Sequence, residues 1–223
     1  MIKKALLILK VLGTLGVLGS FLIIANDLSL NPMSHISVSQ LPLFFTNQSN
    51  ALAAVFFIVT NSMNSRLLIS RATYENMRGG LIIYLFLASS VHWLLLSHLL
   101  HLNSLSMYTA IAYLHSGGFL ILLLDWLLDR PQIKLPFSLT FKWLAYPIAY
   151  LGLMTIYGLF SHWYPYPFIN PELLGFPKWG MINGSITMVM GVLSVAFIKL
   201  NNCRLEKPST RIGHITHDSV GGN

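Results

Sequence analysis

Two residues in otherwise apolar segments have side chains suited to nucleophilic catalysis. Thr46 begins a polar run that continues to Asn50, and His115 lies between Leu114 and Ser116 in a second apolar segment. A threonine hydroxyl attacks a carbonyl only when an adjacent base removes its proton, and histidine has a suitable pKa for that role near neutrality. The two residues therefore predict a nucleophile and its base, provided that the fold brings them together.

Other polar side chains could complete such a site. A catalytic pair needs a group that orients the base and a donor that stabilises the oxyanion. The candidates for these roles, between which the sequence does not choose, are Asn47, Asn50, His92 and Tyr166. Asp125 is excluded because it lies ten residues beyond His115, about 15 Å further along a helix and on another face. We expect Asp125 to mark the cytoplasmic boundary or to pair with Arg130.

The same residues also permit other interpretations. Ser, Thr and Asn side chains commonly join membrane helices by hydrogen bonds, so the polar run could be purely structural. His98 and His101 share a helix face, as in a metal or haem protein, but metal sites usually add carboxylates, and only Asp27 is expected on that side. A transporter or a non-enzymatic scaffold is the remaining alternative, although no internal repeat supports it. We expect no cofactor and no metal.

The composition places these residues in a membrane. Of the 223 residues, 54% are hydrophobic and 9% are charged, and the mean hydropathy is +0.64. A soluble domain has roughly a quarter of its residues charged. A water-soluble domain, a disordered chain and a nucleic-acid-binding protein are therefore excluded. Because a membrane-crossing helix needs about 20 apolar residues, we predict an all-α, polytopic bundle of six transmembrane helices. They lie near residues 4–26, 42–62, 80–102, 108–128, 142–163 and 179–200.

The basic residues predict the orientation. Thirteen of the fourteen Lys and Arg residues fall on one side of the predicted spans, and only Lys178 falls on the other. Cytoplasmic connections collect Lys and Arg, so we predict that both termini are cytoplasmic. Residues 1–203 would form the transmembrane domain, and residues 204–223 a disordered cytoplasmic tail. Thr46 and His115 would then lie about 6 and 10 Å below the outer face, in one layer.

At these positions the chain resembles the androgen-induced protein family of six-span membrane proteins, and its bacterial branch in particular. The segments that carry the resemblance follow one another along the chain. They are Leu43–Thr46 with Ala53–Phe57, His115 with Phe119–Leu122, Asp125–Leu128, Tyr146–Tyr150 and Trp163–Phe168. One departure is that Gly117 and Gly118 follow the histidine, where a proline is expected in the family.

The resemblance implies an activity and a location. Animal members of the family hydrolyse fatty acid esters of hydroxy fatty acids with a threonine and a histidine inside the membrane. Carried over to this chain, the nucleophile is Thr46 and the base is His115. The implied partners are membrane lipids and a lipid-ester substrate, with no nucleic acid. The implied location is the bacterial cytoplasmic (inner) membrane.

Overall fold

The computed structural model describes residues 2–30, 36–61, 69–99 and 104–206. Within these ranges the chain is helical and contains no strand, which confirms the all-α prediction. The α-helices are α1 (Ile2–Leu30), α2 (Phe45–Asn61), α4 (Arg71–Val91), α5 (Leu105–Ala112), α6 (Gly118–Leu128), α7 (Leu139–Ser161), α8 (Pro171–Leu174) and α9 (Phe176–Glu206).

Five helical stretches in the described ranges are long and apolar enough to cross a membrane. They are Lys3–Leu30, Arg71–Leu96, Leu105–Leu128, Leu139–Ser161 and Phe176–Glu206. The predicted span at 42–62 corresponds to α2, which packs against α1 and α4. Its 17 residues rise only about 25 Å, less than the ~30 Å of a hydrocarbon core. The helix therefore lies where a sixth span was predicted, but it is shorter than the other five.

The third predicted span began too late. We expected it to start near residue 80, with Arg71 and Arg78 in the preceding connection, whereas α4 begins at Arg71. Both arginines lie in ion pairs on the helix, and Arg78 is fully buried, so their charge does not end it. The helix begins where the Ser70 hydroxyl accepts a hydrogen bond from the Thr73 amide at 3.1 Å.

Two of the membrane-length stretches contain a π-helical turn. α4 continues into a π turn at His92–Leu96, and a second π turn at Tyr113–Gly117 joins α5 to α6. A π turn adds a residue to one helical turn and is frequent at functional sites. Each of these turns carries one of the candidate histidines, so the helices depart from regular geometry at the positions that matter for the site.

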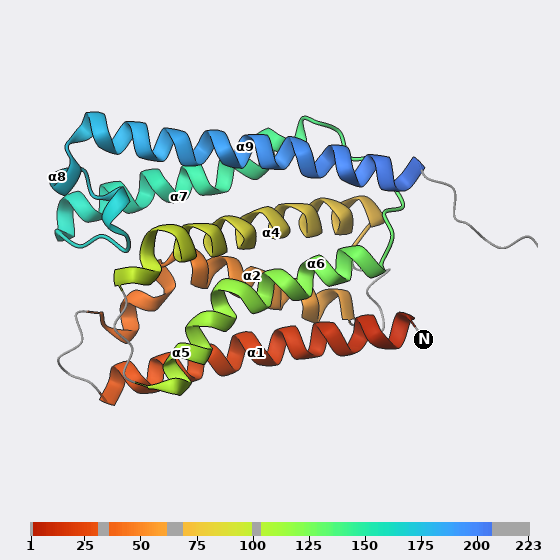
Figure 1. The fold of residues 1–223 in the computed structure, drawn as a ribbon, viewed down its shortest axis with the longest axis horizontal. Coiled ribbons are helices and arrows are strands. Elements are labelled where there is room, and N and C mark those ends of the chain that lie inside the picture. Colours follow the sequence, from red (N-terminus) through yellow and green to blue (C-terminus); the bar gives the residue numbers. More distant parts are fainter. Residues whose placement is uncertain (1, 31–35, 62–68, 100–103, 207–223) are drawn as a thin grey trace, which may run out of the picture.

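The bundle has a hydrophobic core that also contains polar and charged side chains, and its exterior is apolar. α1 lies along one edge, α7 and α9 lie together along the opposite edge, and α4 and α6 lie between them (Figure 1). The outward-facing residues with the most exposed side chains include Leu22, Leu94, Phe141 and Phe160, at 72–85% exposure. An apolar exterior around hydrogen-bonded helices is what a lipid environment requires. The structure therefore indicates a membrane-embedded protein.

The start of α1 and the end of α9 lie at the same end of the bundle (Figure 1). α9 continues to Glu206, so residues 204–206 of the predicted tail are helical. The rest of that predicted tail, residues 207–223, lies outside the described residues.

Candidate active site

A cavity opens between α2, α4, α7, α9 and the loop that precedes α8. The cavity volume is about 70 Å³, which is room for several waters or part of an alkyl chain. Thr46 and His115 both line it, as does Tyr166. The apolar part of the lining includes Leu87, Ala88, Leu144, Ile148, Leu151 and Met190. Thr46, His115 and Tyr166, from distant parts of the sequence, thus share one largely apolar cavity.

Two tyrosine hydroxyls hold the first turn of α2, where Thr46 lies. The Thr46 amide donates to the Tyr166 hydroxyl at 3.3 Å, and the Phe45 amide donates to the Tyr150 hydroxyl at 3.2 Å. Tyr150 in turn donates to the carbonyl of Leu43 at 2.8 Å. The first amides of a helix have no partner within it, so these bonds satisfy donors that would otherwise be unpaired in an apolar site.

Tyr166 is also the partner of the Thr46 side chain. The two hydroxyl oxygens are 3.4 Å apart, and both residues are buried. The Tyr166 ring stacks on Phe168, with centroids 5.1 Å apart and planes within 7°. Burial raises the pKa of the Tyr166 phenol, which therefore keeps its proton at neutral pH. Tyr166 supplies a neutral O–H donor directly beside Thr46.

The π turn sets the position of the His115 ring. Its Nδ1 lies 3.3 Å from the Ala88 carbonyl on α4. A carbonyl only accepts hydrogen bonds, so this contact requires the proton on Nδ1 and leaves a lone pair on Nε2. The ring also stacks face to face on His92, with centroids 3.6 Å apart and planes within 11°. The carbonyl and the second imidazole together fix the plane of a ring that has the tautomer of a base.

Asn50 joins the segments that carry Thr46 and His115. Its Nδ2 donates to the Thr46 carbonyl at 2.9 Å and to the Leu114 carbonyl, within the π turn, at 2.7 Å. The amide is fully buried and packs against Gly118, where a Cβ atom would lie 2.6 Å from Asn50 Oδ1. Gly118 therefore provides the space in which Asn50 connects the two helices.

The remaining predicted residues separate into two groups. His92 contacts the site through its stacking on His115, whereas Asn47 donates to the Leu41 carbonyl and does not line the cavity. Between Thr46 and His115 themselves, the described contacts include no hydrogen bond. His98 is exposed and His101 lies outside the described residues. Within the described ranges, no three His, Cys, Asp or Glu side chains come close enough to hold a metal.

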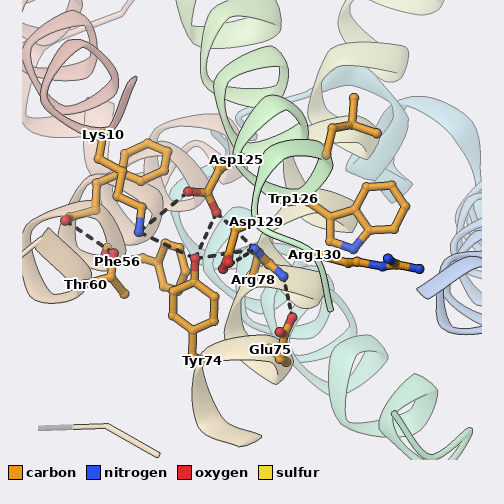
Figure 2. Close-up of polar contacts among 12 residues, drawn as sticks. Lys10, Phe56, Thr60, Tyr74, Glu75, Arg78, Asp125, Trp126, Asp129 and Arg130 are labelled. Atoms are coloured by element: carbon orange, nitrogen blue, oxygen red, sulfur yellow. Dashed lines mark hydrogen bonds and ion pairs between the residues drawn. The ribbon is translucent and has the colours of Figure 1, made fainter. Parts of the chain in front are cut away.

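A buried cluster of charged residues lies near the basic ends of the helices, and the sequence reasoning did not find it. Figure 2 shows the network that joins α1, α4 and α6. Its cations are Lys10, Arg71 and Arg78, its anions are Glu75, Asp125 and Asp129, and the Tyr74 hydroxyl lies among them. Charges inside a membrane bundle are tolerated when they pair. The sequence signal for this cluster would have been the equal number of acidic and basic residues, three of each, in or beside the apolar segments.

Arg78 is the centre of this cluster. Its side chain is fully buried and contacts Glu75 at 2.5 Å, Asp129 at 3.1 Å and Asp125 at 3.3 Å. The Tyr74 hydroxyl donates to Asp125 at 3.0 Å. Asp125, which we expected to mark the cytoplasmic boundary or to pair with Arg130, is fully buried and faces Arg78 and Lys10.

The fold and these two polar sites define a helical membrane protein with a partly enclosed cavity and a buried ionic cluster. Comparison with family models, curated proteins and solved structures finds no match to this chain.

Proposed function

We propose that this protein is an intramembrane hydrolase of lipid esters, such as fatty acid esters of hydroxy fatty acids. The observation that carries the proposal is that Thr46, His115 and Tyr166 line one cavity whose other walls are mostly apolar. The cavity combines a hydroxyl nucleophile, a ring with a free Nε2 and a neutral O–H donor. The resemblance to the androgen-induced protein family assigns the first two roles to the same residues.

The reaction would proceed through an acyl-enzyme. The Thr46 hydroxyl oxygen attacks the ester carbonyl carbon, and His115 Nε2 takes the hydroxyl proton. The bond from that carbon to the alcohol oxygen breaks, and His115 returns the proton to the departing alcohol. A water molecule then attacks the acyl carbon and gives a proton to His115. The bond from that carbon to Thr46 Oγ1 breaks, the fatty acid leaves, and His115 returns the proton to Thr46 Oγ1. Catalytic hydrogen bonds often form only when substrate is bound, so a substrate would complete the contact between these two side chains.

Tyr166 would serve as the oxyanion donor. Negative charge develops on the carbonyl oxygen as Thr46 attacks, and a donor already aimed at that position is usually a large catalytic contribution. The Tyr166 hydroxyl accepts from the Thr46 amide, and when Thr46 is also the donor between the two hydroxyls, the proton of Tyr166 is available to the substrate. Removing a single oxyanion donor typically slows the reaction by about 10²–10³-fold.

The surroundings of the cavity favour an alkyl-chain substrate. Ile148 on α7 lines the cavity and is 49% exposed on the exterior, and Leu151 and Leu96 are partly exposed. A substrate dissolved in the lipid could therefore enter sideways, with its chain against this wall. Lipid esters would reach the site without crossing water.

We also propose that the chain has six transmembrane segments, with both termini in the cytoplasm of a bacterium. The support is the distribution of charge: Lys3, Lys4, Lys134, Lys142 and Arg204 all belong to the helix ends or connections at one end of the bundle. Lys178, at the start of α9, is at the opposite end. By the positive-inside rule, the first end faces the cytoplasm, and the cavity lies in the outer half of the membrane.

The test is hydrolysis of a fatty acid ester of a hydroxy fatty acid by purified protein. Thr46→Ala and His115→Ala should each abolish turnover, and the double variant should be no worse than either alone. Thr46→Ser keeps the hydroxyl and should retain part of the activity. A fluorophosphonate probe should label wild type at Thr46, and labelling should be lost in Thr46→Ala and strongly reduced in His115→Ala.

Thr155→Ala is the matched control, because Thr155 is a buried threonine on α7 that does not line the cavity. It should hydrolyse the ester at the wild-type rate. Full turnover by folded Thr46→Ala would exclude the covalent mechanism and leave the transporter or scaffold class.

A further inference from the structure

A second cavity adjoins the ionic cluster at the basic end of the bundle. It lies between α1, α2 and α4 and offers about 510 Å³ to the centres of water-sized spheres. Its charged lining residues are Lys10, Arg71 and Asp129, and Leu6 and Ile69 contribute apolar walls. This cavity is separate from the proposed active site, which is lined by none of these residues.

Lys10 is the residue that points to a ligand. It is only 7% exposed, so its ammonium group is almost removed from solvent. Its Nζ lies 3.6 Å from Asp125 and 3.5 Å from the Tyr74 hydroxyl (Figure 2). Charge-assisted hydrogen bonds are normally about 2.7–2.9 Å long, so both contacts are weak. The other close neighbours of Nζ are the faces of the Phe56 and Tyr74 rings. A buried ammonium with three N–H donors thus lines the cavity, and no described residue offers it an acceptor closer than 3.5 Å.

Arg71 supplies a second cation at the same cavity. Its Nε and Nη2 bond to Glu75, and Nη2 also contacts Asp129 at 2.9 Å. The Nη1 group takes part in none of these bonds. The side chain remains 31% exposed and can therefore meet a ligand that enters from outside.

The acidic residue in the lining does not oppose an anion. Asp129 Oδ2 contacts both Arg71 and Arg78, at 2.9 and 3.1 Å, so its charge is compensated within the cluster. Asp125 lies behind Lys10 and is paired with Arg78 at 3.3 Å. The cavity therefore presents Lys10, whose nearest acceptors among the described residues are 3.5–3.6 Å away, and Arg71, whose charge is shared with Glu75 and Asp129.

We propose that this cavity binds a phosphate group, with Lys10 and Arg71 as its ligands. A phosphate oxygen would give the Lys10 ammonium the short charged partner that it lacks. Phosphate could come from a phospholipid headgroup or from a soluble phosphate ester. The apolar walls at Leu6 and Ile69 and the proposed cytoplasmic surface at this end favour the headgroup, because acyl chains could then lie against the outside of α1. This inference does not depend on the proposed hydrolase activity.

The experiment is native mass spectrometry of the full chain in an uncharged maltoside detergent. The protein is titrated separately with phosphatidylglycerol, with diacylglycerol that has the same acyl chains, and with glycerol 3-phosphate. Wild type should bind one phosphatidylglycerol and should not retain diacylglycerol. Lys10→Gln should weaken phosphatidylglycerol binding about tenfold or more, because a charged hydrogen bond is lost.

Two further variants keep the test decisive if Lys10→Gln folds poorly. Gln132→Glu adds a negative charge to an exposed side chain in the lining and should weaken binding in a fully folded protein. Lys4→Gln removes an exposed lysine from α1, outside the cavity, and should bind as wild type does. Binding of glycerol 3-phosphate that Gln132→Glu abolishes would support the phosphate site and identify a soluble ligand. Equal retention of diacylglycerol, or unchanged phosphatidylglycerol binding by Lys10→Gln and Gln132→Glu, would overturn the proposal.

Discussion

Replacing Gly118 by alanine should destabilise the protein, although alanine is the better helix former. A Cβ atom at Gly118 would lie 2.6 Å from Asn50 Oδ1, closer than real Cβ atoms approach a neighbour. Asn50 is unable to move away freely, because its Nδ2 is held by the carbonyls of Thr46 and Leu114. The new methyl group should therefore break one or both of these bonds and loosen the π turn that carries His115.

The magnitude follows from the bonds at risk and from a matched glycine. The Asn50–Leu114 bond joins two helices, and such bonds contribute about 0.6–1.7 kcal/mol in membrane proteins. The Asn50–Thr46 bond lies within α2, and a typical net hydrogen bond contributes about 0.5–1.5 kcal/mol, so losing both lowers the free energy of unfolding by about 1–3 kcal/mol. Alanine in place of a helical glycine adds about 1 kcal/mol. Gly152 on α7 has no atom within 4 Å of its Cβ position, so Gly152→Ala should show only the gain. The free energy of unfolding of Gly118→Ala should therefore be about 1–3 kcal/mol lower than that of Gly152→Ala, because the gain in helix propensity is common to both variants.

The assay is thermal unfolding of both variants in detergent, followed by tryptophan fluorescence, together with ester hydrolysis. Gly118→Ala should melt below Gly152→Ala and should lose activity. In an Asn50→Ala background the added Gly118→Ala change should instead stabilise the protein by about 1 kcal/mol, as Gly152→Ala does, because the clash is gone. Equal melting temperatures for Gly118→Ala and Gly152→Ala would refute the argument, since Asn50 would then be free to move.

Three further changes test other parts of the structure. Arg78→Leu leaves buried carboxylates without their main partner and should lower the free energy of unfolding by about 3–5 kcal/mol. Arg78→Lys should remain less stable than wild type, because lysine cannot replace the several contacts of the guanidinium. The control Lys142→Leu changes an exposed residue and should unfold close to the wild-type temperature. His162 ends α7 in the left-handed region, with a φ of 54°, which glycine adopts more easily than alanine. The free energy of unfolding of His162→Gly should therefore exceed that of His162→Ala by about 1 kcal/mol, and His162→Gly should unfold at the higher temperature; the reverse order would contradict this interpretation. A reporter fused after Glu206 should be cytoplasmic and one inserted at Gly175 should lie on the opposite side; the same side for both would contradict the proposed topology.

Much of the fold could be predicted from apolar length alone. The all-α class and the approximate positions of the helices follow from runs of about 20 apolar residues, which the bilayer makes a strong signal. The start of α4 was not predictable in this way, because hydropathy treats Arg71 and Arg78 as the end of a span. Their burial depends on partners that lie on another helix, such as Asp125. A window along one segment cannot contain that information.

The sequence predicted that Thr46 and His115 would lie close together, but it did not predict the geometry of the site. The estimate that Thr46 and His115 occupy one layer agrees with their position in one cavity. The π turns were not predictable, because a hydrogen bond from a different helix, between Asn50 and Leu114, accompanies the turn at His115. The stacking of His92 on His115 depends on both π turns. The sequence therefore identified His92 as a candidate site residue but did not predict its stacking on His115.

The ionic cluster and the proposed active site are connected through the register of two antiparallel helices. Arg78 and Ala88 are ten residues apart on α4. Their partners, Asp125 on α6 and His115 in the π turn before α6, are also ten residues apart. Ten residues rise about 15 Å, so the ion pair and the His115–Ala88 contact match each other in spacing. A shift of one residue at the charged end would rotate the facing side chains by about 100° and remove the carbonyl that sets the His115 tautomer. The buried charges would thus hold the base in place from about 15 Å away, and hydrolysis by Arg78→Lys should fall further than its folded fraction alone accounts for.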